Sequence, residues 1–270
     1  MSELVFGPHP DWPDDDDEPR YRQIAKEYRQ KIITGELHDG DKLPSESQLC
    51  ELHNVSTITA RSAVKLLREW GLAYGVKGKG VFVRRPARLT RIAPQRYFRG
   101  QQARAYIREA EASAVGVDVQ HETTRTTAPA DIATRLGITN GDPVVLTRYF
   151  IRMGNPPQPV TLSTSWEPLA LTAGTDIELP HEGPLADQGI VPRFDHIGLH
   201  VNEVEEILHI RNATPEEARR LELPTNRPVV EITQTFRVAG TDVDEDIAVE
   251  TADIVFAADR YELRYVMEIK

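Results

Sequence analysis

The sequence predicts an α+β fold in two domains: a small three-helix domain with a β-hairpin, then a larger domain built on an antiparallel sheet with short helices. Three observations support this prediction. Apolar residues at helical spacing are followed by short strand patterns over residues 20–84. Positive charge is concentrated in the same segment, and residues 116–268 contain an internal repeat. The expected segments are an acidic, disordered tail at 1–19, the first domain at 20–84, a linker and connecting helix at 85–115, and the second domain at 116–268.

The bulk composition is typical of a cytoplasmic protein. A length of 270 residues favours two compact domains over one. No apolar run approaches the roughly 20 residues that cross a bilayer, and the first residues lack the pattern of a secretory signal. The single cysteine, Cys50, excludes an intramolecular disulfide and leaves no cysteine cluster for zinc. We therefore expect no membrane association, no metal and no cofactor.

The net charge of −10 conceals an uneven distribution. Residues 1–19 hold seven acidic side chains and no Lys or Arg, whereas residues 20–86 hold thirteen Lys or Arg against seven Asp or Glu. A basic block between acidic neighbours is typical of a phosphate-binding module beside a domain with another task. An ordinary solvated surface would explain the charge as well, so the decision depends on the motifs.

The first two helices are marked by their ends. A helix is predicted over Tyr21–Thr34, where four apolar residues recur on one face and Gly35 supplies the stop. Ser45 is followed three residues later by Gln48, which is a capping box, so the second helix starts there.

A third helix and a hairpin complete the small domain. Ser56 caps the third helix, which ends at Gly71. The segments Leu72–Val76 and Val81–Val83 are predicted as two short strands, joined by the turn Lys77–Gly80. Two helices around a tight turn, followed by a hairpin with a basic tip, form a winged helix-turn-helix.

The start of the third helix has the chemistry that reads DNA. Ser56, Thr57 and Thr59 place hydroxyl groups at the helix N-terminus, where phosphates are bound, and Arg61 shares a face with Thr57. Arg61 is suited to a bidentate contact with guanine, and Lys65 to a backbone contact one turn on. Two alternatives remain open here: Ser56 acts as a cap alone, and Arg61 forms a surface ion pair.

The hairpin tip suits the minor groove. Gly78 allows close approach of the backbone, and Lys77 and Lys79 flank it.

Residues 8–19 are rich in Asp and Pro, which predicts disorder. This segment either serves solubility alone or acts as an acidic arm that competes with DNA. The arginines of the 85–115 linker, which includes a short helix near Gln101–Ala112, either touch phosphates or belong to a solvated hinge.

An internal repeat organises the second domain. Residues 133–136 are echoed by 218–221, and Pro143–Val145 by Pro228–Val230, both with an offset of 85 positions. Each copy predicts a short helix, a turn, a strand, a hairpin turn and another strand. Two such copies form one antiparallel sheet with pseudo-twofold symmetry, and the space between the halves is a common ligand site.

The repeat also suggests ligand-binding residues. Ser165 and Glu250 differ by the same offset of 85, so we interpret them as equivalent positions, and alternation places Ser163 on the same face. An anionic effector would need guanidinium groups, which nearby strands offer at Arg148, Arg152 and Arg211. Outward surface pairing of these arginines is the alternative, as is an exposed position for Glu250.

The small domain resembles the GntR family of bacterial regulators. The resemblance lies in Leu43–Glu46, Val55–Arg61 and Lys77–Val83, in this order and spacing. It implies that Ser45 and Glu46 belong to the DNA-binding surface with the third helix and the wing. The family usually has Arg where this chain has Ser47, and often Arg where it has Thr57.

The second domain resembles the UTRA effector domain of the HutC subfamily. The matching stretches are Thr214–Ala218, Pro228–Ile232, Val249–Glu250 and Asp259–Leu263. This resemblance implies a chorismate-lyase-like fold without enzyme activity, a homodimer, a small-molecule effector and palindromic double-stranded operators. Members that bind sugar phosphates have an inward Glu near Ser163 and a Tyr at the position of Phe256. The resemblance therefore makes Phe256 a candidate effector-binding residue, and the two differences argue against a hexosamine phosphate here.

Three functions follow in order of preference. The first is a repressor whose operator affinity responds to a small molecule in the second domain. The second is a DNA-binding repressor that is constitutive or controlled by a partner protein. The third is a lyase-like enzyme, which the sequence disfavours because it has no metal-ligand spacing, phosphate loop or nucleophile elbow.

Overall fold

The computed structural model describes residues 18–76, 78–84, 89–93, 97, 100, 103–154, 157–223, 227–239 and 246–266. The chain forms two compact units, residues 1–86 and 87–270. Most of the predicted acidic tail and Lys77 lie outside the described residues.

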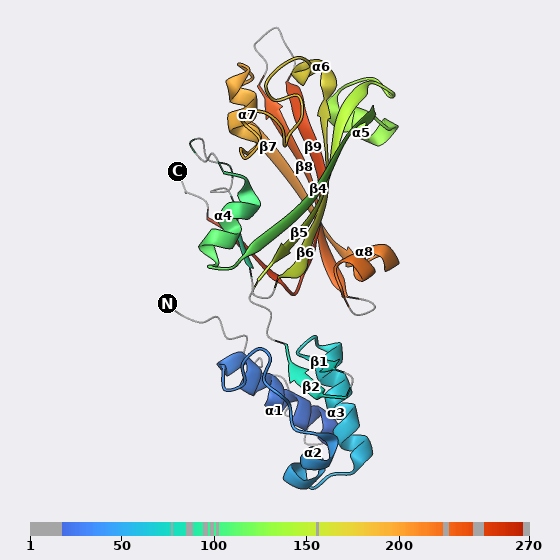
Figure 1. The fold of residues 1–270 in the computed structure, drawn as a ribbon. Helices are drawn as coiled ribbons and strands as arrows, with labels where there is room; N and C mark the ends of the chain where they lie inside the picture. The colour runs from blue at the N-terminus through green and yellow to red at the C-terminus, as the bar shows by residue number, and fades with distance from the viewer. Residues whose placement is uncertain are drawn as a thin grey trace. The chain divides into compact units, whose positions relative to one another are not determined.

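The first unit has the predicted order of three helices and a hairpin (Figure 1). Its elements are α1 (Arg20–Thr34), α2 (Glu46–His53), α3 (Thr57–Glu69), β1 (Ala73–Val76) and β2 (Gly80–Val83). The strands β1 and β2 pair in antiparallel fashion, and Lys42 adds a bridge to Phe82. The wing is therefore built from three segments of the chain.

Local signals set the ends of these helices. Ser45 accepts a hydrogen bond from the backbone of Gln48, whose side chain in turn accepts from the backbone of Ser45, so the capping box is complete. Gly35 ends α1 with a left-handed φ of 81°. The buried faces of α1 and α3 then form one core, which includes Ile24, Ile32 and Leu67.

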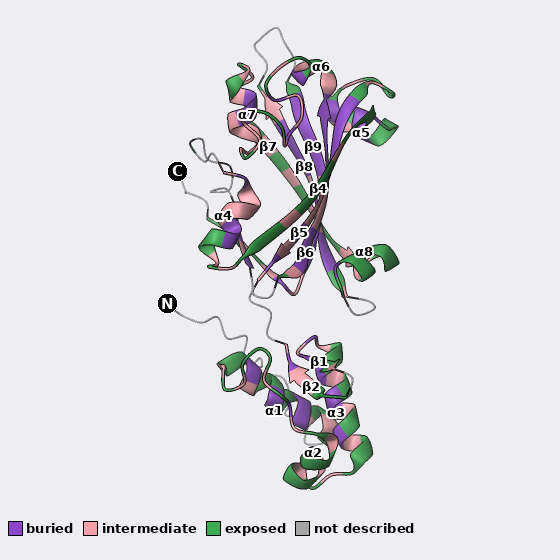
Figure 2. Cartoon of the chain, viewed as in Figure 1, coloured by how far each residue is buried: buried purple, intermediate pink, exposed green. Residues whose placement is uncertain are grey.

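The second unit is centred on a six-stranded antiparallel sheet with the order β4-β5-β6-β9-β8-β7. The strands are β4 (Val117–Thr127), β5 (Pro143–Met153), β6 (Gln158–Pro168), β7 (Glu203–Asn212), β8 (Pro228–Val238) and β9 (Ile247–Ala257). The short helices are α4 (Ala105–Ala112), α5 (Ala130–Leu136), α6 (Leu169–Thr172), α7 (Ile190–His196) and α8 (Pro215–Arg220). Figure 2 shows the central strands mostly buried and the edge strand β4 mostly exposed.

The two halves of the sheet follow the predicted repeat, with one correction. Residues 143–153 and 228–238 keep the offset of 85. The next strand does not: Thr147 pairs with Ser165, whereas its counterpart Ile232 pairs with Ile254. The counterpart of Ser165 is therefore Ile254 rather than Glu250. The hairpin of the second half is four residues longer than that of the first.

The sheet has different layers on its two faces. On one face, α5 packs on Val144 and Trp166, and Leu221, just after α8, packs on Val229. On the other face, α4 contributes Ala110 to a cluster with Ile151. Helix α7 lies over this second face as well, where Phe194 packs against Phe236. Residues on alternate positions of each strand therefore meet different neighbours.

Part of the expected linker belongs to the second unit. Residues Leu89–Ala93 form β3, which pairs in parallel with β10 (Tyr261–Tyr265). Leu89 is buried in the cluster that contains α4. The expected helix at 101–112 is shorter and starts at Ala105. The sequence pattern missed β3 because its parallel partner lies about 170 residues away, beyond the reach of local periodicity. Within the described parts of the chain, no helix is both long and apolar enough to span a membrane.

Candidate DNA-binding surface and effector cavity

The turn between α2 and α3 presents the start of α3 to solvent. Asn54 adopts a left-handed φ of 50°, which turns the chain between the helices. The Ser56 hydroxyl accepts a hydrogen bond from the backbone of Thr59 at 3.2 Å and lies 2.9 Å from its hydroxyl. Ser56 is therefore a helix cap that remains exposed, and Thr57 beside it is exposed too, whereas Thr59 is half-buried.

Arg61 on α3 is held by a carboxylate from α2. Its Nη2 donates to Glu46 Oε2 at 2.9 Å, and its Nε donates to both carboxylate oxygens at 3.2 Å. The hydrogen bond from Arg61 holds the pKa of Glu46 below its ordinary value. Both side chains stay exposed, 69% for Arg61 and 40% for Glu46. The alternative considered for Arg61, a surface ion pair, therefore holds in part: the pair exists, but its partner comes from the neighbouring helix rather than from α3 itself.

Two further side chains of α3 share this surface. Lys65 forms an exposed ion pair with Glu69 at 3.7 Å. Ile58 is 78% exposed, which is unusual for an apolar side chain next to a helix cap. Ile58 is not among the residues that the sequence motif predicts to bind DNA, although its place between two threonines at the helix start is a usable signal.

The wing carries its basic groups at an open turn. Gly78 adopts a φ of 75°, and a Cβ atom there would meet nothing within 4 Å. The backbone of Lys79 donates to Val76 at 3.0 Å, which closes the turn. Lys42 lies against the wing, because a Cβ atom on Gly80 would approach its Cε to 2.9 Å. Lys42 was missed because it precedes the recognisable motifs.

A cavity of about 150 Å³ lies in the second unit, on the sheet face covered by α4 and α7. Ser163, Ser165 and Glu250 line it, as their predicted shared face requires. The other lining residues come from β5, β6, β8 and β9, from the start of α7, from the first turn of α4 and from the segment that leads into it. Apolar side chains form much of the wall; they include Ile151, Phe236 and Ile254.

Glu250 is the buried acid of this cavity. Its side chain is 6% exposed, and its pKa is raised to about 8 by burial and by the negative charge of Glu167. A hydrogen bond from Ser165 opposes that shift. Among the described residues, Glu250 Oε2 has no hydrogen-bond partner. Glu250 therefore lines the cavity with a buried carboxyl, one oxygen of which has unused hydrogen-bonding capacity.

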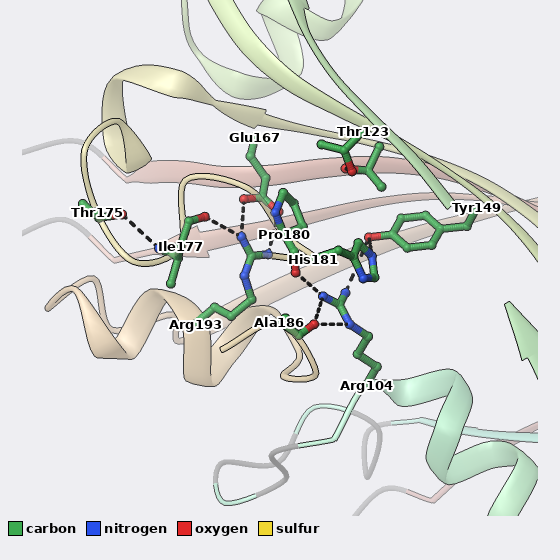
Figure 3. A network of polar contacts seen from close by, with 11 residues as sticks. Arg104, Thr123, Tyr149, Glu167, Thr175, Ile177, Pro180, His181, Ala186 and Arg193 are labelled. Atoms are coloured by element: carbon green, nitrogen blue, oxygen red, sulfur yellow. Dashed lines mark hydrogen bonds and ion pairs between the residues drawn. The ribbon is translucent and has the colours of Figure 1, made fainter. Parts of the chain in front are cut away.

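Two guanidinium groups near Glu250 are occupied by the protein itself (Figure 3). Arg193 binds both carboxylate oxygens of Glu167, at 2.8 and 2.9 Å, and donates to the carbonyl of Ile177 at 2.8 Å. Arg104 donates to the carbonyl of Ala186 at 2.7 Å and to that of Pro180. These contacts fasten the loop between α6 and α7 to the sheet.

Tyr149 connects this network to a pair of histidines. Its hydroxyl lies 3.0 Å from His181 Nε2 and 3.5 Å from Arg104 Nη1. The ring of His181 stacks on His121 at a centroid distance of 3.7 Å. Burial and the neighbouring Arg104 charge lower the pKa of His181 to about 3, so this imidazole is neutral at physiological pH.

The three predicted arginines do not reach the cavity. Arg148 and Arg152 alternate with Tyr149 and Ile151 on β5, so they lie on the opposite face of the sheet. Arg148 is exposed, and Arg152 approaches Glu222 at 3.8 Å. Arg211 forms ion pairs with Glu217 and Glu231 at 2.7 and 2.8 Å. The alternative of outward pairing thus describes Arg152 and Arg211.

Phe256 is also displaced from its expected role. It lies on the cavity side of the sheet, but its ring packs against Tyr261 at a centroid distance of 4.5 Å and does not line the cavity. Tyr149, Arg104 and Gln234 do line the cavity, although the repeat did not predict them. Tyr149 could have been found from the strand register, because it pairs directly with Ser163. Arg104 carried no local signal.

Comparisons with known proteins agree with both units. Residues 20–83 match the model described as bacterial regulatory proteins of the gntR family, and residues 119–262 match the UTRA domain. An HTH-type transcriptional regulator of Streptomyces coelicolor is 31% identical, with 86% of this chain and 88% of that protein covered. The HTH-type transcriptional repressor NagR of Bacillus subtilis is 27% identical, with 93% and 95% covered.

Solved structures show the same fold. A crystal structure titled as a GntR-family transcriptional regulator is 34% identical with a TM-score of 0.61, and the match covers 94% of this chain and 99% of that chain. PhnF from Mycobacterium smegmatis is 19% identical with a TM-score of 0.55, covering 92% and 100%. The second likeness concerns the fold alone.

Proposed function

Because the chain belongs to the GntR family of bacterial regulatory proteins and carries a UTRA domain, we propose that it is a ligand-responsive repressor that binds a palindromic operator as a homodimer. Family membership makes the protein a DNA-binding transcription regulator and not an enzyme. We propose, in addition, that it acts as a repressor, that it forms a dimer and that individual residues have the roles described next.

The observation that carries the proposal is the exposed start of α3, in a unit that also has a wing with Gly78 and Lys79 at its turn. Ser56 and Thr57 offer hydroxyl groups to phosphates at the helix N-terminus, and Arg61 offers two parallel donors to guanine. Ile58 lies between them and is suited to the methyl group of thymine. Thr59 supports this surface through its contact with Ser56.

The remaining candidate residues either position Arg61 or contact the DNA backbone and minor groove. Ser45 starts α2 and thereby places Glu46 against Arg61. Lys65 follows one turn after Arg61 and suits a phosphate contact. In the wing, Lys79 beside Gly78 is suited to the adjacent minor groove. For Lys77 we propose the same role on the basis of the sequence alone.

A homodimer explains how so small a surface would achieve specificity. One helix contacts only a few base pairs, and a twofold dimer doubles that number on a palindromic site. The description of the Bacillus relative as a repressor supports repression as the mode of action here.

The cavity of the second unit is the proposed effector site, with Ser163, Ser165 and Glu250 as polar contacts. A ligand that binds one arrangement of the dimer better than another shifts the population between them. A coupling free energy of about 1–3 kcal/mol would change operator affinity by roughly 5- to 150-fold.

The test is operator selection from random duplex DNA with the full chain, followed by affinity measurements on the selected site. Arg61→Ala should cost about 1–3 kcal/mol on that site and relax the preference at one base position. Arg29→Ala is the matched control, because Arg29 is an exposed arginine on α1. Failure to select any site, or equal effects of the two variants on selectivity, would contradict the proposal.

A further inference from the structure

The charged groups around the cavity are not equally available to a ligand. Arg104 and Arg193 are engaged by carbonyl oxygens and by Glu167, as described above. Arg108 also lines the cavity, and it too interacts with other protein groups. Glu250 is different, because its Oε2 has no hydrogen-bond partner among the described residues.

The position of Glu250 explains why this oxygen is free. It lies on β9 opposite Phe236 of β8, and its neighbours on the cavity face are Ala252 and Ile254, which have no polar side-chain atoms. Ser165 from β6 provides its side-chain hydrogen bond. A buried acceptor without a partner carries a free-energy cost that a bound donor would remove.

The rest of the cavity indicates the body of the ligand. A volume of about 150 Å³ is that of a cavity known to hold a benzene ring. Apolar side chains line much of the cavity: Phe236 lies opposite Glu250 on β8, and Ile151 and Ile254 lie farther along the sheet. A ring-sized apolar body with one polar head fits both the volume and the wall.

We propose that the cavity recognises a small, ring-sized ligand through a cationic amine that donates hydrogen bonds to Glu250. This inference rests on the proposed function of the cavity as the effector site. It replaces the anionic effector that the sequence suggested, because the strand arginines on which that idea depended lie elsewhere. An anionic head would be repelled by Glu250 once its carboxyl is ionised, and it would gain no unpaired arginine among Arg104 and Arg193.

Recognition of an amine by Glu250 should depend on pH. The groups that face Glu250 are Glu167, Arg193, Arg104, the Tyr149 hydroxyl and the Ser165 hydroxyl, and the pKa of Glu250 in the cavity is about 8. Below that pH its carboxyl is mostly protonated, so an ammonium group must displace a proton in order to bind. Affinity should therefore rise with pH up to about 8 and then level off.

The experiment compares three ligands of one shape by calorimetry on the full chain. The probes are cyclohexylamine, which stays protonated over the range used, cyclohexanol and cyclohexanecarboxylate. We expect the amine to bind most tightly, with a Kd that falls about tenfold or more between pH 6.5 and 8.5, since each pH unit below a pKa changes the ionised fraction about tenfold. Glu250→Gln should remove both the preference and the pH dependence.

Matched controls separate recognition from folding. Glu122→Gln removes an exposed carboxylate on the opposite face of the sheet and should leave amine binding unchanged. Thermal unfolding checks that Glu250→Gln remains folded. Equal or tighter binding of the alcohol or the carboxylate, no binding of the amine at millimolar concentration, or amine binding that survives Glu250→Gln would each overturn the inference.

Operator binding, measured on the same preparations, keeps the two proposals apart. Retention of operator binding with failed amine recognition overturns only the ligand assignment. Loss of selective operator binding by the unmodified chain overturns the proposed function, whatever the calorimetry shows.

Discussion

Arg61 on the recognition helix and Glu46 at the start of α2 form an ion pair 2.9 Å long that joins the two helices of the DNA-binding motif. The pair is exposed, so solvent screens it and its contribution to stability is small. Its value lies in orientation, because Arg61 is already extended along the surface before DNA arrives.

Glu46→Gln should therefore change specificity more than stability. The variant removes a negative charge next to the phosphates, so affinity for random duplex DNA should rise, by no more than about fivefold. Arg61 loses its orientation, so the ratio of operator to random affinity should fall. Fluorescence anisotropy on both duplexes measures that ratio, and an unchanged ratio would contradict an orienting role. Glu51→Gln, an exposed acid on the same helix, is the control.

The wing lysines should act through phosphates rather than bases. Lys79→Ala, and separately Lys77→Ala, should weaken binding to operator and random DNA alike. Each substitution should reduce the slope of log affinity against log salt by about 1. A titration from low to moderate salt gives this slope. A selective loss on the operator alone would instead point to a base contact.

The buried ion pair between Arg193 and Glu167 should be costly to break. Both side chains are almost fully inaccessible, at 1% and 2% exposure, and Arg193→Met would leave Glu167 buried without its cation. We expect a loss of about 3–5 kcal/mol in the free energy of unfolding of the second unit, measured by urea denaturation. Arg219→Met, which breaks an exposed pair with Glu216, should cost less than about 1 kcal/mol. The double variant Glu167→Gln with Arg193→Met should recover much of the loss.

Glu250 should make stability depend on pH. Its pKa in the folded chain is about 8, above the ordinary value of 4.5, so the folded state binds more protons between these values. Its contribution to stability is therefore fully present below about pH 4.5 and is lost as pH rises through 8. In the unmodified chain, Glu250 should lower the free energy of unfolding by on the order of 3 kcal/mol between pH 5 and 8.5. Glu250→Gln should remove this decrease. Equal pH profiles for the two proteins would show that Glu250 is not buried as described.

Much of the fold could be predicted because its signals are local. The helix ends at Gly35, Ser45 and Ser56 depend on residues within one turn, and the structure has them at the expected places. The repeat also predicted the sheet correctly in outline. Its offset failed on the last strand, where a longer hairpin shifts the register by four residues. Because four is an even number, Glu250 stayed on the face predicted for it.

The sequence by itself determined the order of the elements in the first unit, the recognition motif and the two-copy plan of the sheet, because caps, turns and alternation over a few residues specify each of them. Only the tertiary structure decided which charges meet. It placed Arg148 and Arg152 on the far face, paired Arg61 with Glu46, and surrounded Glu250 with residues from distant segments. A shift of one residue along a strand reverses the face of a side chain, and contacts between distant segments leave no periodic trace in the chain.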